Sequence, residues 1–207
     1  MVFLVGYMYS GKTTVARQLA QYLSVHHGVE VDVVDTDEAL ENRYHITVTD
    51  CFRRYGESMF RTLESTVLKQ LSACPHGTIK AVGGQQQADT NVITQSHNNA
   101  ITIVSTGGGT PCFNDNMQWM LDHGLTLYLK LDESIILRRM AASRNVRPSI
   151  AQLTPDERAR FVHEQLQNRE PFYNRAHVVY DGIEPDIAAI AQKILESLSS
   201  VQKGSVV

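Results

Sequence analysis

The sequence has few cysteines and lacks any long apolar run. Its three cysteines, Cys51, Cys74 and Cys112, are odd in number and widely spaced, which argues against a disulfide framework and is typical of free thiols in a reducing compartment. No stretch is long and apolar enough to span a bilayer. The first apolar run is only as long as a strand, so we expect no targeting signal there. These features predict a cytoplasmic protein without a membrane partner.

A strong excess of one charge is also missing. The net charge is -3 and the isoelectric point is near 6.2, which disfavours a general nucleic-acid partner. The eight histidines form no metal-ligand spacing with the cysteines, so we assign no zinc site. A length of 207 residues suits one α/β domain with a full core, and we expect a single domain over residues 1–207.

The most informative stretch is GYMYSGKTT at residues 6–14, which fits G-x-x-x-x-G-K-[ST]. An apolar run at residues 2–5 precedes it, and an apolar stripe at helical spacing follows it to about residue 25. In this pattern the loop amides and the helix N-terminus cradle phosphate, Lys12 reaches the β- and γ-phosphates, and the Thr13 hydroxyl can ligate Mg²⁺. The alternative, a chance glycine-rich turn, is disfavoured by the strand–loop–helix setting. The stretch therefore predicts a Mg-nucleotide site.

A second strand at residues 31–34 ends at Asp35-Thr36-Asp37. Strand, helix and strand form one βαβ unit, which requires a parallel sheet. Ligands of such sheets bind at the carboxyl ends of the strands, so Asp35 and Asp37 should share a cleft with the phosphate loop. One carboxylate could hold a Mg²⁺-bound water and the other could accept or orient an acceptor hydroxyl. The alternative is a helix N-cap with acids in the first turn.

The remaining periodicity alternates between strands and helices. A helix is expected to start near Thr47, and a further one covers residues 57–71, where Arg61 and Glu64 form an i, i+3 pair that is typical of a solvated surface. A strand at 101–104 leads into Gly107-Gly108-Gly109, whose backbone can approach a ligand closely; a flexible linker is the alternative. Further elements are expected at 125–131 (strand), 132–142 (helix), from Pro155 to residues 168–171 (helix), 178–180 (strand) and 187–198 (helix).

Two segments do not fit a regular element. Residues 143–153 form a basic loop between two helices, which is typical of a mobile lid near a phosphate site; a plain surface loop is the alternative. Residues 72–100 are polar and rich in turn residues, and either an extended hairpin or a disordered loop would suit them. Because this insertion precedes a strand, we expect it at the amino ends of the strands, away from the cleft. The sequence gives no indication of its purpose.

Several motifs together resemble the shikimate kinases, a group within the P-loop kinases similar to the nucleoside-monophosphate kinases. They are GYMYSGKTT, DTD at 35–37, YGESMFRTLE at 55–64, STGGG at 105–109, Arg147-Pro148, and NREPFY at 168–173. Their order agrees with the family along nearly the whole chain. The resemblance implies a three-layer α/β/α P-loop fold, a five-stranded parallel sheet in the order 2-3-1-4-5, and a mobile lid. It also implies a monomer.

The implied reaction transfers the γ-phosphoryl group of ATP to the 3-hydroxyl of shikimate, with Mg²⁺, in aromatic amino-acid biosynthesis. The resemblance assigns the acceptor to Asp37 (the candidate base), Arg61, Gly108 and Arg169, with Glu64 anchoring Arg61. It assigns ATP to Tyr9, Ser10, Gly11, Lys12, Thr13, Thr14, Arg139 and Arg147, with Arg139 stacking on adenine. It assigns the metal to Thr13 and, through water, to Asp35. Lys12, Asp37 and Arg147 are the expected catalytic residues.

The sequence departs from the family pattern at a few places. Tyr9 stands where a small residue is usual, and Ser149-Ile150 replace the usual lid residues after Arg147-Pro148. Glu64 and Gly107 are 43 positions apart, which is longer than the family spacing. Two rival functions remain: another small-molecule kinase of this fold, such as a gluconate or nucleoside-monophosphate kinase, and a non-catalytic nucleotide-binding module that docks through residues 72–100.

Overall fold

Five parallel strands form the central sheet of this protein, for which the structure is a computed structural model describing residues 1–71, 100–143, 150 and 152–203. The strands are β1 (Val2–Val5), β2 (Val31–Asp35), β3 (Ile101–Ser105), β4 (Leu125–Lys130) and β5 (Val178–Asp181). Their spatial order is β2-β3-β1-β4-β5, and every adjacent pair is parallel. The expected sheet and its order are confirmed.

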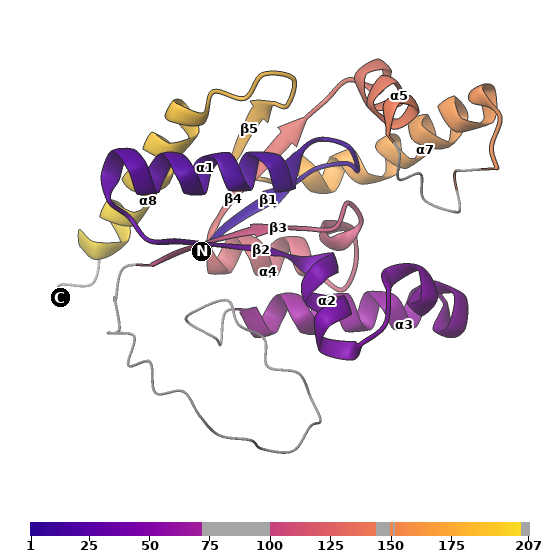
Figure 1. Ribbon diagram of the computed structural model, residues 1–207, viewed down its shortest axis with the longest axis horizontal. Coiled ribbons are helices and arrows are strands. Elements are labelled where there is room, and N and C mark those ends of the chain that lie inside the picture. The colour runs from indigo at the N-terminus through magenta and orange to yellow at the C-terminus, as the bar shows by residue number, and fades with distance from the viewer. Residues whose placement is uncertain (72–99, 144–149, 151, 204–207) are drawn as a thin grey trace.

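Side chains of the central strand alternate between two apolar cores, as the pleat requires. Val2 and Leu4 pack with α1 (Lys12–His27) and α8 (Ile187–Lys203). Phe3 and Val5 face the other core, which includes residues of α3 (Val48–Leu71), α4 (Asn116–His123) and α7 (Pro155–Tyr173). Figure 1 shows α1 and α8 lying together on one side of the sheet. The three-layer α/β/α arrangement is therefore confirmed.

Helices α2 (Thr36–Tyr44) and α3 carry a third, smaller core at the β2 edge of the sheet. The sequence predicted one helix start near Thr47 and a second helix from residue 57. The structure joins them into α3, with a kink at Gly56, whose φ of 77° only glycine adopts readily. The kink brings the rings of Phe52 and Phe60 to within 4.3 Å of each other, centroid to centroid.

Helix α7 differs from its predicted boundary. It begins as expected at Pro155, with a capping box between Thr154 and Glu157, but it continues through Pro171 to Tyr173. The predicted stop at residues 168–171 is therefore wrong. Proline disfavours a helical conformation in the residue before it, but tertiary contacts outweigh that preference here, since Tyr173 is fully buried and its hydroxyl donates a hydrogen bond to the Gly108 carbonyl.

Several predictions fall outside the described residues. They concern residues 72–99 of the insertion predicted at 72–100, with Cys74, and residues 144–149 and 151 of the lid predicted at 143–153, with Arg147 and Pro148. The predicted lid segment follows α5 (Glu133–Ala142) along the chain. Cys51 and Cys112 are free thiols, as expected. Among the helices that the structure describes, none combines the length and apolar character needed to cross a membrane.

Candidate active site

The phosphate loop connects β1 to α1 at the carboxyl end of the sheet. Three of its residues have positive φ: Gly6 at 144°, Tyr9 at 65° and Gly11 at 89°. Helix α1 begins with no side-chain cap and no acid in its first turn, so its first N–H groups stay available to an anion. Tyr9, the unusual residue of this loop, adopts the left-handed conformation that a non-glycine residue rarely takes. The bulkier side chain therefore fits the loop at a small cost in backbone strain.

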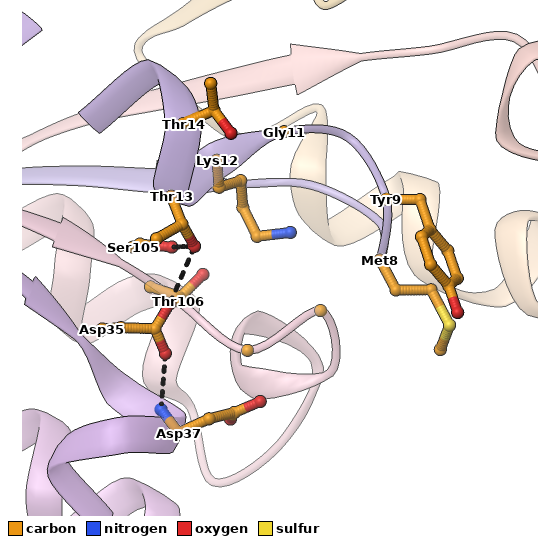
Figure 2. Close-up of a pocket in the computed structure, with 12 residues that line it drawn as sticks. Met8, Tyr9, Gly11, Lys12, Thr13, Thr14, Asp35, Asp37, Ser105 and Thr106 are labelled. Atoms are coloured by element: carbon orange, nitrogen blue, oxygen red, sulfur yellow. Dashed lines mark hydrogen bonds between the residues drawn. The ribbon is translucent and has the colours of Figure 1, made fainter. Parts of the chain in front are cut away.

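Lys12 lies inside the loop and is 8% exposed. Its Nζ donates hydrogen bonds to the carbonyls of Gly6 at 2.9 Å and Tyr7 at 2.8 Å, and it lies 3.4 Å from Ser10 Oγ. Figure 2 shows the ammonium group projecting into a cavity of about 300 Å³. The lysine therefore holds the loop main chain and presents its charge where an anion would lie.

Asp35 caps a helix, as the alternative reading of the sequence expected, and its second oxygen contacts the start of α1. One oxygen, Oδ1, caps α2 by accepting from the main-chain N–H of Asp37 at 3.0 Å and of Glu38 at 3.4 Å. The other, Oδ2, accepts from Thr13 Oγ1 at 2.8 Å. Thr13 Oγ1 also lies 3.0 Å from Ser105 Oγ at the end of β3. Side-chain oxygens from three different elements thus meet beside the phosphate loop.

The same cavity contains most of the predicted nucleotide and acceptor residues. Its lining includes Tyr9, Gly11, Lys12, Thr13, Thr14, Asp35, Asp37, Ser105 and Gly108. Asp37 lies at the far side from the phosphate loop in Figure 2. The parallel sheet explains this grouping, because the loops after β1, β2 and β3 all leave from one edge.

The three glycines after β3 separate the phosphate loop from the acidic side of the cavity. A Cβ on Gly108 would lie 3.0 Å from Met8 N and 3.6 Å from Gly6 O, both main-chain atoms of the phosphate loop. A Cβ on Gly107 would lie 2.7 Å from Glu64 Oε1 and 2.9 Å from Asp37 Oδ1. The backbone of these glycines therefore packs closely against the protein's own chain on both sides, and its approach to a ligand stays a prediction.

Arg61 and Glu64 form a buried ion pair, so the reading of this pair as a solvated surface feature is wrong. Their exposed fractions are 8% and 1%, and Arg61 NH1 donates to Glu64 Oε2 at 2.9 Å. Glu64 Oε1 also accepts from Thr110 Oγ1 at 2.6 Å. Burial raises the pKa of Glu64, and Arg61 and Thr110 oppose that increase. The i, i+3 spacing is typical of a surface pair. In the folded protein, however, the loop after β3 covers Arg61 and Glu64.

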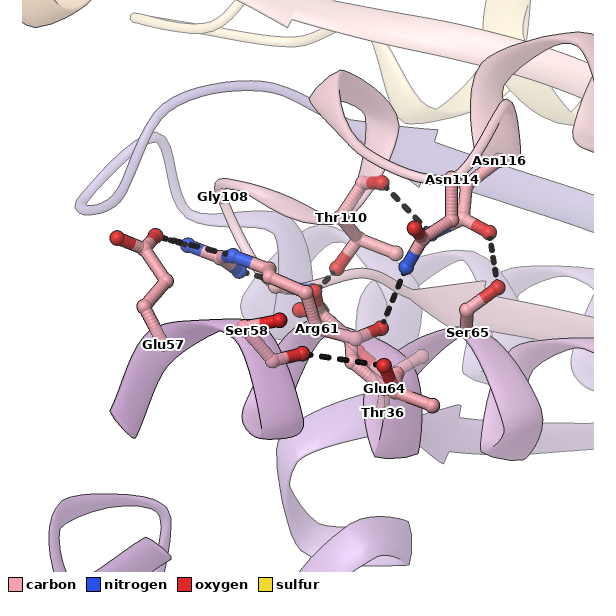
Figure 3. Close-up of polar contacts among 12 residues, drawn as sticks. Thr36, Glu57, Ser58, Arg61, Glu64, Ser65, Gly108, Thr110, Asn114 and Asn116 are labelled. Atoms are coloured by element: carbon pink, nitrogen blue, oxygen red, sulfur yellow. Dashed lines mark hydrogen bonds and ion pairs between the residues drawn. The ribbon is translucent and has the colours of Figure 1, made fainter. Parts of the chain in front are cut away.

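Aromatic rings and a second carboxylate complete the surroundings of Arg61. Its guanidinium carbon lies 4.3 Å from the ring centroid of Phe113, and its Nε and NH2 donate to Glu57 Oε1 at 3.2 and 3.0 Å. Figure 3 shows Arg61 between Glu57 and Glu64. Buried hydrogen bonds from Ser65 to Asn116 and from Asn116 to the Thr110 carbonyl attach the loop after β3 to α3. The guanidinium is thereby fixed in one orientation.

Arg169, on α7, lies beside Tyr7 of the phosphate loop. Its guanidinium lies 5.7 Å from the ring centroid of Tyr7. Both Arg169 and Arg61 act electrostatically on the thiol of Cys112, lowering a pKa that burial raises overall to about 11. Arg61 and Arg169, from distant parts of the chain, thus both lie in the neighbourhood of Cys112.

Some residues of the site were missed or placed differently by the sequence. Ser105 stands in the quoted STGGG motif, and its position at a strand end could have identified it. Tyr173 stands in the quoted NREPFY motif, but nothing in that motif indicated a bond to Gly108. Glu57 stands in the quoted YGESMFRTLE motif, and its i, i+4 spacing to Arg61 could have indicated their ion pair. Arg139 lies outside the cavity lining and donates to main-chain carbonyls of the phosphate loop.

Comparison with known proteins adds an independent finding. The family model described as "Shikimate kinase" matches residues 8–101 and 85–199. A shikimate kinase of Phocaeicola vulgatus is 32% identical over 197 residues, which is 95% of each chain. The chain belongs to the shikimate kinase family. A crystal structure of the shikimate kinase from Bacteroides thetaiotaomicron superposes with a TM-score of 0.73 at 30% identity, covering 96% of this chain and 97% of that one.

A shikimate kinase from Acinetobacter baumannii, solved in complex with shikimate, superposes with a TM-score of 0.67 at 28% identity and covers 96% of this chain and 92% of that one. The resemblance inferred from the motifs is thus confirmed over nearly the whole shikimate kinase fold.

Gly109 gives a direct test of the guanidinium position. Its φ of -93° suits any residue, but an added Cβ would lie 2.6 Å from Arg61 NH2 and 2.7 Å from NH1. We expect Gly109→Ala to displace Arg61 and to weaken shikimate binding by about tenfold, since a misplaced charge-assisted contact costs about 1.5 kcal/mol or more. Titration calorimetry with shikimate and with MgADP measures both effects, and MgADP affinity should stay within about twofold. Unchanged shikimate affinity would show that Arg61 does not contact this acceptor.

Proposed function

We propose that the protein transfers the γ-phosphoryl group of ATP to the 3-hydroxyl of shikimate, giving shikimate 3-phosphate and ADP, in the pathway to chorismate and the aromatic amino acids. One observation carries the proposal: a phosphate loop and a buried, fixed guanidinium lie on either side of the main chain of Gly107–Gly109. A hydroxylated ring that bears a carboxylate fits the second part, since arginine binds a carboxylate through paired N–H donors.

Residue roles in the proposal follow from position. Lys12 neutralises charge on the β- and γ-phosphates, while the N–H groups at the start of α1 bind them. Arg61 and Arg169 hold the acceptor carboxylate, with Glu64 and Thr110 fixing Arg61. Gly108 supplies main-chain contact with the ring. Asp37 orients the acceptor hydroxyl and accepts its proton as the new P–O bond forms. Arg147, outside the described residues, is proposed to neutralise the transferring group.

The donor set beside the phosphate loop fits Mg²⁺. Thr13, Asp35 and Ser105 present oxygen atoms, which Mg²⁺ prefers, and they already contact one another through Thr13 Oγ1. We propose Thr13 as a direct ligand and Asp35 as a ligand through water. When bound, the ion would offset the negative charge of the phosphates. ATP as co-substrate accords with a cytoplasmic location, and the protein is proposed to act as a monomer.

Asp37→Asn tests whether this carboxylate acts as a base, because the substitution keeps the size and shape of the side chain. The amide is isosteric but cannot accept the hydroxyl proton, so we expect kcat to fall by about a hundredfold, in line with the usual contribution of a general base. MgATP affinity should not change. Steady-state kinetics with shikimate measures the effect, and Asp122→Asn on the exposed side of α4 is the matched control. A kcat within about threefold of the wild type would remove Asp37 from the mechanism, given the magnitude expected of a base.

The function itself is tested by measuring ADP release with MgATP and a panel of acceptors: shikimate, quinate, gluconate and nucleoside monophosphates. Strong turnover with shikimate alone is the expected result. Turnover with another acceptor would support the assignment of the phosphate loop to ATP but would show that shikimate is not the acceptor. Tight ATP binding without turnover of any acceptor would favour a nucleotide-binding module over an enzyme.

A further inference from the structure

Arg139 connects two loops that are far apart in the sequence. From α5 its NH1 donates to the carbonyls of Tyr9 and Ser10, each at 3.2 Å. Its NH2 donates to the carbonyl of Gly182 at 3.1 Å and, more weakly, to that of Ile183 at 3.5 Å. One guanidinium group thus bridges the phosphate loop and the loop after β5.

The loop after β5, which accepts two of these bonds, is itself held in place by hydrogen bonds. The Gly182 N–H donates to the Lys130 carbonyl at the end of β4 at 2.8 Å, and the Ile183 N–H donates to Asp181 Oδ1 at 2.8 Å. A Cβ on Gly182 would lie 3.0 Å from the same Lys130 carbonyl, so this loop packs closely on the sheet. Arg139 therefore ties the phosphate loop to the sheet edge formed by β4 and β5.

The bonds to the phosphate loop determine where its amides point. The peptide group is planar and trans, so a carbonyl and the N–H that follows it point in opposite directions. With the Ser10 carbonyl held by Arg139, the Gly11 N–H is directed to the other side, and Gly11 lines the cavity. The left-handed conformation of Tyr9 costs free energy, which such bonds offset. In this arrangement Arg139 acts on the nucleotide site through main-chain atoms.

The charge of Arg139 also remains available to an anion. Within the described parts of the chain, no carboxylate forms an ion pair with this guanidinium, and its hydrogen bonds go to neutral carbonyls. A cation that is close to the phosphate loop and is not neutralised adds to the positive potential there.

We propose that Arg139 is a positioning residue for the polyphosphate part of the nucleotide, fixing the Ser10–Gly11 peptide group so that its N–H faces the phosphates. This differs from an adenine-stacking role, because it predicts an effect on any polyphosphate, with or without a base. The proposal rests on the phosphate loop binding a nucleotide, as in the proposed function, but it does not depend on the acceptor.

The test compares Arg139→Gln with Arg138→Gln, a matched loss of one positive charge from the neighbouring, exposed position of α5. Titration calorimetry measures the binding of MgATP and of magnesium tripolyphosphate, which has the phosphates without the base. We expect Arg139→Gln to weaken both ligands by the same factor of about tenfold or more, as the loss of charge-assisted bonds predicts. Arg138→Gln should leave both affinities within about twofold of the wild type, since an exposed charge contributes little.

The opposite pattern overturns the proposal. If Arg139→Gln weakens MgATP alone and spares tripolyphosphate, the side chain acts on the base. No measurable tripolyphosphate binding by the wild type would also overturn it, because a loop held in a phosphate-binding conformation must bind phosphate without a base. Failure to phosphorylate shikimate, with both ligands bound normally, would reject the proposed function and leave this inference intact.

Two further measurements cover a variant that folds poorly. Arg139→Lys keeps the charge but cannot donate to both loops at once, so it should lose about as much tripolyphosphate affinity as Arg139→Gln. Full affinity in the lysine variant would show that charge alone suffices and would overturn the bridge. In the ligand-free protein, hydrogen exchange at the Gly11 and Lys12 amides should accelerate in both Arg139 variants and not in Arg138→Gln. Unchanged exchange would contradict a role in fixing the loop.

Discussion

Replacing Lys12 with methionine should reduce turnover of shikimate by about a thousandfold, because a cation on the transferring phosphoryl group can contribute that much. Methionine keeps an unbranched apolar stem of similar length, so the buried volume is filled. The Gly6 and Tyr7 carbonyls lose their ammonium donor, but β1 and α1 remain packed in the core. Steady-state kinetics and thermal unfolding measure the two properties separately.

Lys193→Met, on the exposed side of α8, is the control for loss of a lysine. Its kcat should be that of the wild type. A Lys12→Met enzyme that kept more than about a tenth of the wild-type kcat would be incompatible with a lysine that neutralises the transferring group.

Replacing Arg61 with alanine should affect both substrate binding and stability. The acceptor loses its principal cation, so the KM for shikimate should rise by about a hundredfold while the affinity for MgATP is preserved, as the removal of a buried charge partner predicts. Glu64, only 1% exposed, loses its ion-pair partner. The expected loss of unfolding free energy is about 3 kcal/mol, the usual cost of breaking a buried pair.

The loss of stability in Arg61→Ala should grow with pH. Burial already raises the pKa of Glu64, and Arg61 is the main opposing influence, so its removal raises that pKa further. Between the unfolded and folded pKa values the native state binds more protons than the unfolded state, and stability therefore falls as pH rises. Urea unfolding should show a larger difference from the wild type at about pH 7.5 than at about pH 5.

Arg61→Ala/Glu64→Gln is the matched control, since it removes the unpaired charge. It should recover part of the stability and lose the pH dependence, but not recover the KM. A KM for shikimate equal to that of the wild type in Arg61→Ala would show the carboxylate assignment to be wrong.

Local sequence was sufficient to predict the elements whose pattern and packing agree. The β1–phosphate loop–α1 unit has apolar periodicity, glycines and a lysine at fixed positions, and the structure follows them. The grouping of Lys12, Asp37 and Gly108 was also predictable, because a parallel sheet brings strand ends to one edge.

Predictions failed where contacts distant in sequence decide the outcome. The burial of Arg61 and Glu64 depends on Thr110 and Phe113, about 50 residues later, so no window around α3 could reveal it. The persistence of α7 beyond Pro171 depends on the burial of Tyr173 against another loop. The carbonyl partners of Arg139 are main-chain atoms, and main-chain partners leave no mark in a sequence.

The close packing of the Gly108 main chain against the phosphate loop has a consequence for inhibitor design. A Cβ at this position would lie only 3.0 Å from the main-chain N of Met8, so any side chain would crowd the phosphate loop, and the Gly108 carbonyl accepts a hydrogen bond from the Tyr173 hydroxyl. A compound that spans the nucleotide and acceptor pockets and bonds to this backbone would rely on atoms that a point mutation does not remove. Resistance would then have to arise at the pocket rims, where Tyr9 and Glu57 supply contacts that a single substitution can change.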